Sequence, residues 1–190
     1  MAYTLHQVLQ DEQGLTDPFL VYQLAQALFT HPQAYLIDAR LDTRDFGSLS
    51  HVVLGFIETL QPWFYVTMLD TVPTGAIWVT DFEDASGVPF AASMGGIAFP
   101  RTNPAHNQEA FSQVIEATFN QCDTLEILRS RTLASNRAAK RFLYQVGFIQ
   151  PEPIRGMGVL NGELVDGINL SITRTEWLNR NKQQEPLPDG

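Results

Sequence analysis

The sequence has a single cysteine, Cys122, among its 190 residues. One cysteine cannot form an internal disulfide or a thiolate cluster, which excludes a disulfide-stapled fold and a zinc finger. The four histidines are scattered along the chain, without metal-ligand spacing to one another or to acidic residues. We therefore predict no metal site, a reducing compartment and a fold that is held together by its apolar core.

Positive charge is also scarce, because 12 Lys and Arg residues face 21 Asp and Glu residues, for a net charge of −9. Nucleic acids and anionic membranes bind basic surfaces, so neither is an expected partner. No apolar run is long enough to cross a bilayer, and the N-terminus lacks the basic-then-apolar order of a signal peptide. The expected location is the cytoplasm, or a virion that is assembled in the cytoplasm.

Helical patterns dominate the first sixty residues. Asp17 followed by Pro18 predicts a helix N-cap with proline at the first helical position. Apolar residues then recur at helical spacing, at Leu20, Leu24, Ala27 and Leu28. A second apolar stripe predicts another helix, with Leu49, Val52, Val53, Phe56, Ile57 and Leu60 on one face.

From Trp63 onward the apolar pattern changes to that of strands. Aromatic and β-branched runs predict three antiparallel strands near residues 63–69, 75–82 and 90–99. The next predicted helix buries Phe111, Val114, Ile115 and Phe119, and a buried strand over 124–128 follows it. A further helix is predicted from Ser135 to Gly147, with Ala138, Ala139, Phe142 and Val146 inside. A hairpin around Asn161-Gly162 and a last strand over 168–178 complete the pattern.

This order of elements predicts a single α+β domain with one mixed sheet. Residues 1–60 would form its helical part and residues 61–178 its sheet core. The segment 179–190 is polar and contains two prolines, so it is not expected to fold by itself. We expect this tail to contact either another chain or the long N-terminal helices.

Four stretches between Gly75 and Trp177 carry family-like motifs: QEAFSQVIEATF (108–119), NRAAKRFLYQVGF (136–148), NGELVDG (161–167) and SITRTEW (171–177). In this order and spacing they resemble the GCN5-related N-acetyltransferases (GNAT), and among them the RimJ/RimL-like branch, which acetylates protein N-termini. The resemblance implies a GNAT-like mixed β-sheet flanked by helices. The helical N-terminal region is larger here than is usual in that family.

The resemblance also implies an acyl-CoA cleft where two parallel strands separate. The cofactor acetyl-CoA would lie near Ile97 and Phe99, with Asn136 and Ala139 from the later helix. Its pyrophosphate would rest on amides of the helix start at Asn107, Gln108 and Glu109. A substrate amine would attack the thioester, an amide of the strand would hold the oxyanion, and an acid would protonate the thiolate.

The loop of residues 101–107 in this implied site contains no glycine. When Glu109 is aligned with the acidic residue of the family, its two loop glycines fall at Asn103 and Ala105, with Pro104 between them. Glycine lets a backbone approach a phosphate closely, and proline has no amide hydrogen to donate. We therefore predict that this loop narrows the cleft, with Pro104 at its tightest point, and that the cleft is vestigial and binds no cofactor.

A catalytic acid is not evident either. Many GNAT enzymes have a tyrosine at the position of Leu143, although the RimJ/RimL-like branch often lacks it. Tyr144 is one residue later, about 100° further round the helix. Tyr144 is thus only a fallback for the acid. His106 and the pair Glu83–Asp84 are explained as readily by solvation and turn chemistry. Gly95-Gly96 is predicted to form a β-bulge where the strands separate.

Two functions stay open at this point. One is a GNAT-fold protein that has lost catalysis and is a structural subunit of an assembly, with a tailed-phage virion as the concrete setting. Its partners would be other protein subunits, met through the N-terminal helices and the C-terminal tail. The other is an active acetyl-CoA-dependent N-acetyltransferase on a protein N-terminus or small amine, whose acidic surface would suit a cationic substrate. The N-terminal helices could then wall an acceptor groove.

Overall fold

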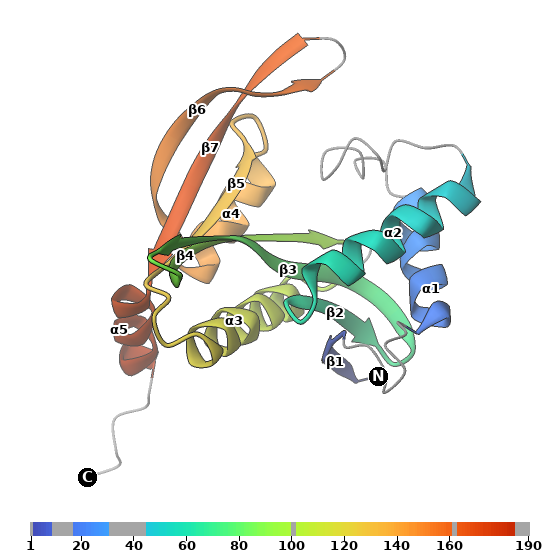
Figure 1. Ribbon diagram of the computed structural model, residues 1–190, viewed down its shortest axis with the longest axis horizontal. Helices are drawn as coiled ribbons and strands as arrows, with labels where there is room; N and C mark the ends of the chain where they lie inside the picture. Colours follow the sequence, from blue (N-terminus) through green and yellow to red (C-terminus); the bar gives the residue numbers. More distant parts are fainter. Residues whose placement is uncertain (1, 9–16, 31–44, 100–101, 161–162, 185–190) are drawn as a thin grey trace. The chain divides into compact units, whose positions relative to one another are not determined.

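A computed structural model of the chain describes residues 2–8, 17–30, 45–99, 102–160 and 163–184 (Figure 1). In chain order the helices and strands are β1 (Tyr3–Gln7), α1 (Pro18–Phe29), α2 (Phe46–Leu60), β2 (Phe64–Leu69), β3 (Val72–Ala85), β4 (Val88–Ala98), α3 (Pro104–Gln121), β5 (Ile127–Leu133), α4 (Arg137–Val146), β6 (Ile149–Leu160), β7 (Glu163–Thr173) and α5 (Arg174–Gln184).

All of these strands belong to one mixed sheet, in the order β1-β2-β3-β4-β5-β7-β6. The pair β4–β5 is parallel, whereas β1–β2, β2–β3, β5–β7 and β6–β7 are antiparallel. The predicted α+β class with a mixed sheet is confirmed. So is the hairpin, because Leu160 at the end of β6 is paired with Glu163 at the start of β7; the predicted turn residues 161–162 lie outside the described part of the chain.

The chain forms two compact units, and β3, β4 and α3 contribute residues to both. The first unit comprises Met1–Val79 and Gly96–Ala110, and the second comprises Thr80–Gly95 and Phe111–Gly190. The prediction of a single domain over residues 1–178 stays a prediction.

In the first unit, α1 and α2 lie side by side (Figure 1) and bury an apolar cluster with β2 and β3. Asp17 accepts a hydrogen bond from the Phe19 amide at 2.9 Å and caps α1, as predicted. Asp45 caps α2 in the same way, through the Ser48 amide at 2.9 Å. The fully buried side chains include Leu24, Leu49, Ile57 and Val66.

In the second unit, α3 buries the predicted face, which consists of Phe111, Val114, Ile115 and Phe119. The predicted face of α4 is only partly right. Ala138 is exposed and Ala139 and Phe142 are half-buried, whereas Leu143 and Val146 are buried. The N-cap of α4 is Asn136 rather than Ser135, since its side chain accepts from the Ala139 amide at 3.0 Å.

Strand β1 was not predicted, because its short run of alternating residues lies in a region of helical patterns. The last predicted strand ends at Thr173, where α5 begins. Thr173 and Glu176 form a reciprocal capping box: the Thr173 amide donates to the Glu176 carboxylate at 2.8 Å, and the Glu176 amide donates to the Thr173 hydroxyl at 3.2 Å.

Helix α5 also takes in the first half of the polar tail, which was not expected to fold by itself. Trp177 is buried, and Arg180 donates a hydrogen bond to the carbonyl of Gln145 on α4. The described part of the tail therefore folds with the help of α4. Residues 185–190 lie outside the described part of the chain.

Tyr65 on β2 leads to a prediction about stability. It is only 3% exposed, and its hydroxyl has no hydrogen-bond partner among the described residues. A buried hydroxyl without a partner costs about 1–3 kcal/mol. We expect Tyr65→Phe to raise the free energy of unfolding by about 1 kcal/mol in urea titrations at neutral pH. Substitution of exposed Tyr144 by Phe is the matched control and should change little.

The same residue gives a dependence on pH. Burial raises the pKa of the Tyr65 phenol above its ordinary value of 10.0, because desolvation disfavours the phenolate. The unfolded chain therefore loses this proton at lower pH than the folded chain, and folded stability falls as the pH rises above 10. We expect Tyr65→Phe to lack the part of the stability loss above pH 10 that ionisation of this phenol causes. Equal losses of stability above pH 10 in the wild-type chain and in Tyr65→Phe would contradict a raised pKa of Tyr65.

Candidate functional site

Helix α3 begins at Pro104, several residues earlier than the sequence predicted. Proline is favourable at the first helical position, because its fixed φ suits the helix and its missing amide hydrogen would have had no intrahelical partner there. Pro104 is thus an exposed residue that begins α3, and the expectation that it lies at the tightest point of a narrowed cleft stays a prediction. Residues 100–101 lie outside the described part of the chain.

The amides of the first turn of α3 are engaged by a single residue, Asn103. The Ala105 amide donates to the Asn103 side-chain oxygen at 3.0 Å. The His106 and Asn107 amides donate to the Asn103 carbonyl at 3.1 and 3.3 Å. Pro104 has no amide hydrogen. A phosphate at this helix end would have to displace the Asn103 side chain and would still lack one donor.

Side chains around the same turn are tied to their neighbours. Asn107 donates to the Thr102 hydroxyl at 3.0 Å. The His106 ring is stacked on the ring of Tyr3 from β1, with centroids 3.7 Å apart and planes inclined by 19°. Glu109 is exposed, and its carboxylate lies 3.9 Å from the His106 ring. These contacts hold the first turn of α3 in its self-capped form, in which Asn103 caps the helix.

Ile97 and Phe99, the predicted cofactor residues at the end of β4, belong to the apolar core of the first unit. Phe99 is 6% exposed, and its amide donates to the Thr74 carbonyl of β3 at 2.9 Å. Both side chains line an apolar cavity of about 30 Å³. The other lining residues are Leu24, Leu28, Val53, Phe56, Phe64, Ala76 and Trp78. These two side chains therefore contribute to packing in this unit.

In the second unit, the parallel ladder of β4 and β5 pairs Ala91 with Ile127 and Ser93 with Arg129. Within the described register, Met94 and Gly95 continue β4 without a partner on β5. The ladder thus ends earlier on β4 than the predicted place of separation near Ile97 and Phe99, and β5 begins at Ile127, later than predicted. The separation of the two strands stays a prediction. The predicted bulge at Gly95-Gly96 stays a prediction.

Helix α4 holds the remaining predicted residues. Asn136 and Ala139 are joined by the capping bond of the helix start, so the Asn136 oxygen already has a donor. Tyr144 is 47% exposed, and Leu143, at the position of the family tyrosine, is 4% exposed. The inward side of α4 at this level is therefore aliphatic and supplies no proton donor.

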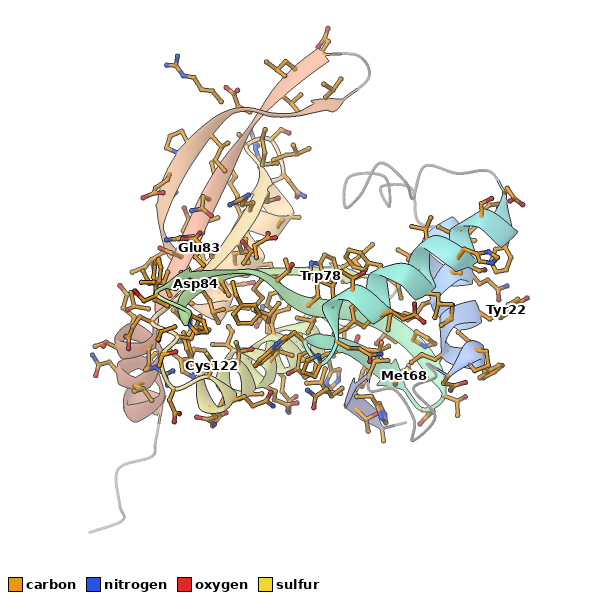
Figure 2. The ribbon with its side chains drawn as sticks, viewed as in Figure 1. Tyr22, Met68, Trp78, Glu83, Asp84 and Cys122 are labelled. Carbon is orange, nitrogen blue, oxygen red and sulfur yellow. The ribbon has the colours of Figure 1, made fainter. Side chains whose placement is uncertain are left out.

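Glu83 and Asp84, labelled in Figure 2, have structural partners. Glu83 forms an ion pair with Arg129 on β5, and Asp84 accepts from the Gly87 amide at 3.1 Å in the turn after β3. Among the described residues there is no group of three side chains that could hold a metal ion. None of the described helices is long and apolar enough to span a membrane.

The capping of α3 by Asn103 is the feature of this helix start that was not predicted from the sequence. Its signal was present, because asparagine followed by proline is the same N-cap pattern that correctly placed the start of α1 at Asp17-Pro18. Because Glu109 was aligned with the acidic residue of the family, Asn103 was interpreted as the replacement of a glycine and not as a helix cap.

Solved structures of acetyltransferases resemble this chain. The protein yncA of Salmonella typhimurium, solved with its cofactor acetyl-CoA, superimposes with a TM-score of 0.69 at 16% identity, covering 100% of this chain and 99% of its own. The ribosomal-protein-S5-alanine acetyltransferase of Vibrio fischeri gives 0.68 at 13%, covering 92% and 94%. RimL, a ribosomal L7/L12 alpha-N-protein acetyltransferase in complex with coenzyme A, gives 0.67 at 14%, covering 90% and 94%.

The likeness lies in the fold, which is that of the GNAT acetyltransferases. The predicted GNAT-like architecture is therefore confirmed. No protein-family model matches the sequence, and no curated protein matches it.

Proposed function

We propose that this chain is a GNAT-fold protein that does not hold acyl-CoA, has lost acetyl transfer and is a subunit of a larger protein assembly. The observation that carries the proposal is the self-capped start of α3. Asn103 accepts from Ala105, His106 and Asn107, and Pro104 has no amide hydrogen. The residues present therefore do not fit the pyrophosphate of the cofactor.

The energetic consequence can be estimated. A hydrogen bond from a backbone amide to a charged group contributes about 1.5–3 kcal/mol. The donor lost at Pro104, together with the cap that must be broken at Ala105, would weaken binding by two to four powers of ten. Such a loss moves a dissociation constant of about 1 μM to about 0.1–10 mM.

The absence of an inward acid supports the same proposal. Leu143 is buried where many GNAT enzymes carry tyrosine, and Tyr144 is half exposed. A thiolate leaving group would then have no protein acid from α4. Loss of the phosphate site and loss of the acid point in the same direction, and a stable α+β fold can be kept for other uses. The phage setting stays a prediction.

An active N-acetyltransferase on a protein N-terminus or small amine is the second candidate. It is favoured by the parallel β4–β5 ladder, which ends after three registered pairs, and by the acetyl-CoA and coenzyme A bound in similar structures. The two candidates differ in one measurable property. Calorimetric titration with acetyl-CoA, followed by a transfer assay on N-terminal peptides and spermidine, separates them.

A further inference from the structure

We propose that the outer face of α4 docks an acidic helix of a different protein. Three side chains form this face and are called the α4 stripe: Arg137, Arg141 and Tyr144. The structure describes residues 102–160 without a gap, so the chain on both sides of the helix is included. The inference goes beyond the proposed function, because it rests on the second unit alone and stands whether or not acyl-CoA binds.

Charge is distributed unevenly along the chain around this helix. Residues 127–151 hold five of the 12 Lys and Arg residues and none of the 21 Asp and Glu residues. This segment therefore carries +5, and because the whole chain carries −9, the remainder carries −14. Charges further apart than about 8 Å are largely screened at physiological ionic strength, so an anion near α4 meets mainly the local cations.

The stripe residues lie on one side of α4. They are separated by four and three residues, which places them on successive turns of one helix face. All three are exposed, whereas Leu143 and Val146 of the same helix are buried. The two arginines follow each other at about 6 Å along the helix axis, and the tyrosine ring lies on the next turn.

The stripe does not contribute to the stability of α4 itself. Arg137 is the first residue of the helix, where the partial positive charge of the helix end disfavours a cation. Arg137 and Arg141 are four residues apart, a spacing at which like charges repel each other. The helix contains no acidic residue, and neither arginine forms an ion pair among the described residues. An anion from outside the chain would relieve both costs.

The spacing of the two arginines identifies a helix as the occupant. Each guanidinium can hold a carboxylate through two parallel hydrogen bonds. Glutamates four residues apart on a partner helix repeat at the same distance of about 6 Å. An apolar side chain on its next turn would cover the ring of Tyr144, and Tyr and Arg are enriched among the residues that dominate binding energy at interfaces.

A nucleic acid fits this surface less well. Its phosphates follow one another more closely than the two arginines do, and the rest of the chain is acidic. Phosphates beyond the stripe would therefore meet carboxylates. A peptide helix can place its carboxylates only where the cations are.

A designed peptide tests the surface directly. The peptide has about 20 residues, enough to be helical, and carries pairs of glutamates four residues apart, each followed three positions later by leucine. Fluorescence anisotropy with the full-length protein should show saturable binding at about 0.05 M salt that weakens at least tenfold at about 0.5 M. A single-stranded oligonucleotide of equal charge should bind more weakly. Tighter binding of the oligonucleotide, or no binding of the peptide at millimolar protein, overturns the proposal.

Charge reversal on α4 locates the contact. Arg137→Glu combined with Arg141→Glu should weaken peptide binding at least tenfold. The variant helix is expected to form, because an acidic residue is favourable in the first turn. The matched control, Arg131→Glu with Arg155→Glu, makes the same change of net charge at exposed arginines of β5 and β6 and should alter binding less than threefold. Equal losses in both double variants would assign binding to net charge and overturn the proposal.

A complementary exchange tests the pairing of charges. A peptide with lysine in place of its glutamates should bind the chain with both α4 substitutions at least tenfold more tightly than it binds the wild-type chain or the control variant. Failure of this exchange overturns the α4 stripe.

The same titrations in millimolar acetyl-CoA separate this inference from the proposed function. The acidic peptide should bind equally well with and without acetyl-CoA. Competition between the two would place the peptide in the cofactor cleft and overturn the stripe. Binding of acetyl-CoA without competition would contradict the proposed function and leave the stripe intact.

Discussion

Replacement of Asn103, Pro104 and Ala105 by glycine is expected to strengthen acetyl-CoA binding at least a hundredfold. The change removes the Asn103 side chain from the Ala105 amide, to which it is bonded at 3.0 Å, and supplies the amide hydrogen that Pro104 lacks. Two charge-assisted contacts of about 1.5–3 kcal/mol each would be regained. Isothermal titration calorimetry of the triple variant against the wild-type chain measures the gain.

The matched control for this variant removes a cap at another helix. In Asp17→Gly, the side chain that accepts from the Phe19 amide at the start of α1 is lost, and acetyl-CoA affinity should not change. Glycine is tolerated at an N-cap at a cost of a few tenths of a kcal/mol, so both variants are expected to fold. Equal affinities for wild-type and triple-glycine chains would mean that the helix start is not what prevents binding.

Gly75→Ala is expected to lower the free energy of unfolding by about 3 kcal/mol. A Cβ atom at this position of β3 would lie 2.6 Å from the carbonyl oxygen of Ile97 and 2.9 Å from the hydroxyl oxygen of Thr67. The first of these atoms belongs to the backbone of β4 and cannot rotate away. The substitution must therefore push two neighbouring strands apart at the end of β4.

Gly55→Ala on α2 is the control for that prediction. A Cβ atom there would meet nothing within 4 Å, and alanine is a better helix former than glycine by about 0.5–1 kcal/mol. Urea titrations should thus show opposite signs for the two glycine substitutions. If Gly75→Ala unfolds at the same urea concentration as the wild-type chain, the close approach of the strands is wrong.

The fold class and the buried face of α3 were predicted from local patterns in the sequence, and the GNAT architecture was predicted from the resemblance of four motifs to that family. The same kind of pattern was present but not used at two places. Asn103-Pro104 marks a helix start as clearly as Asp17-Pro18 does, and Thr173 with Glu176 forms a capping box. At Asn103 the alignment with the family motif placed the boundary elsewhere, and at Thr173 the strand-like pattern of residues 168–178 did.

Other features could not be predicted, since they depend on residues far apart in the chain. The unpaired hydroxyl of Tyr65 and the close approach of Gly75 to Ile97 follow from how strands pack, which no local period records. The inward face of α4 was predicted only in part: Val146 is buried as predicted, but Leu143 was missed, and the alanines are compatible with either face. The large side chains Leu143 and Val146 decided which side was buried.

Calorimetric titration of the unmodified full-length protein with acetyl-CoA tests the proposed function most directly. The Asn103 side chain occupies the Ala105 amide at the start of α3 and Pro104 offers no amide hydrogen, so no saturable heat is expected below about 0.1 mM cofactor. The triple-glycine variant, titrated in parallel, shows that the assay can detect binding. A micromolar dissociation constant for the wild-type chain would contradict the loss of the cofactor site and favour an active acetyltransferase.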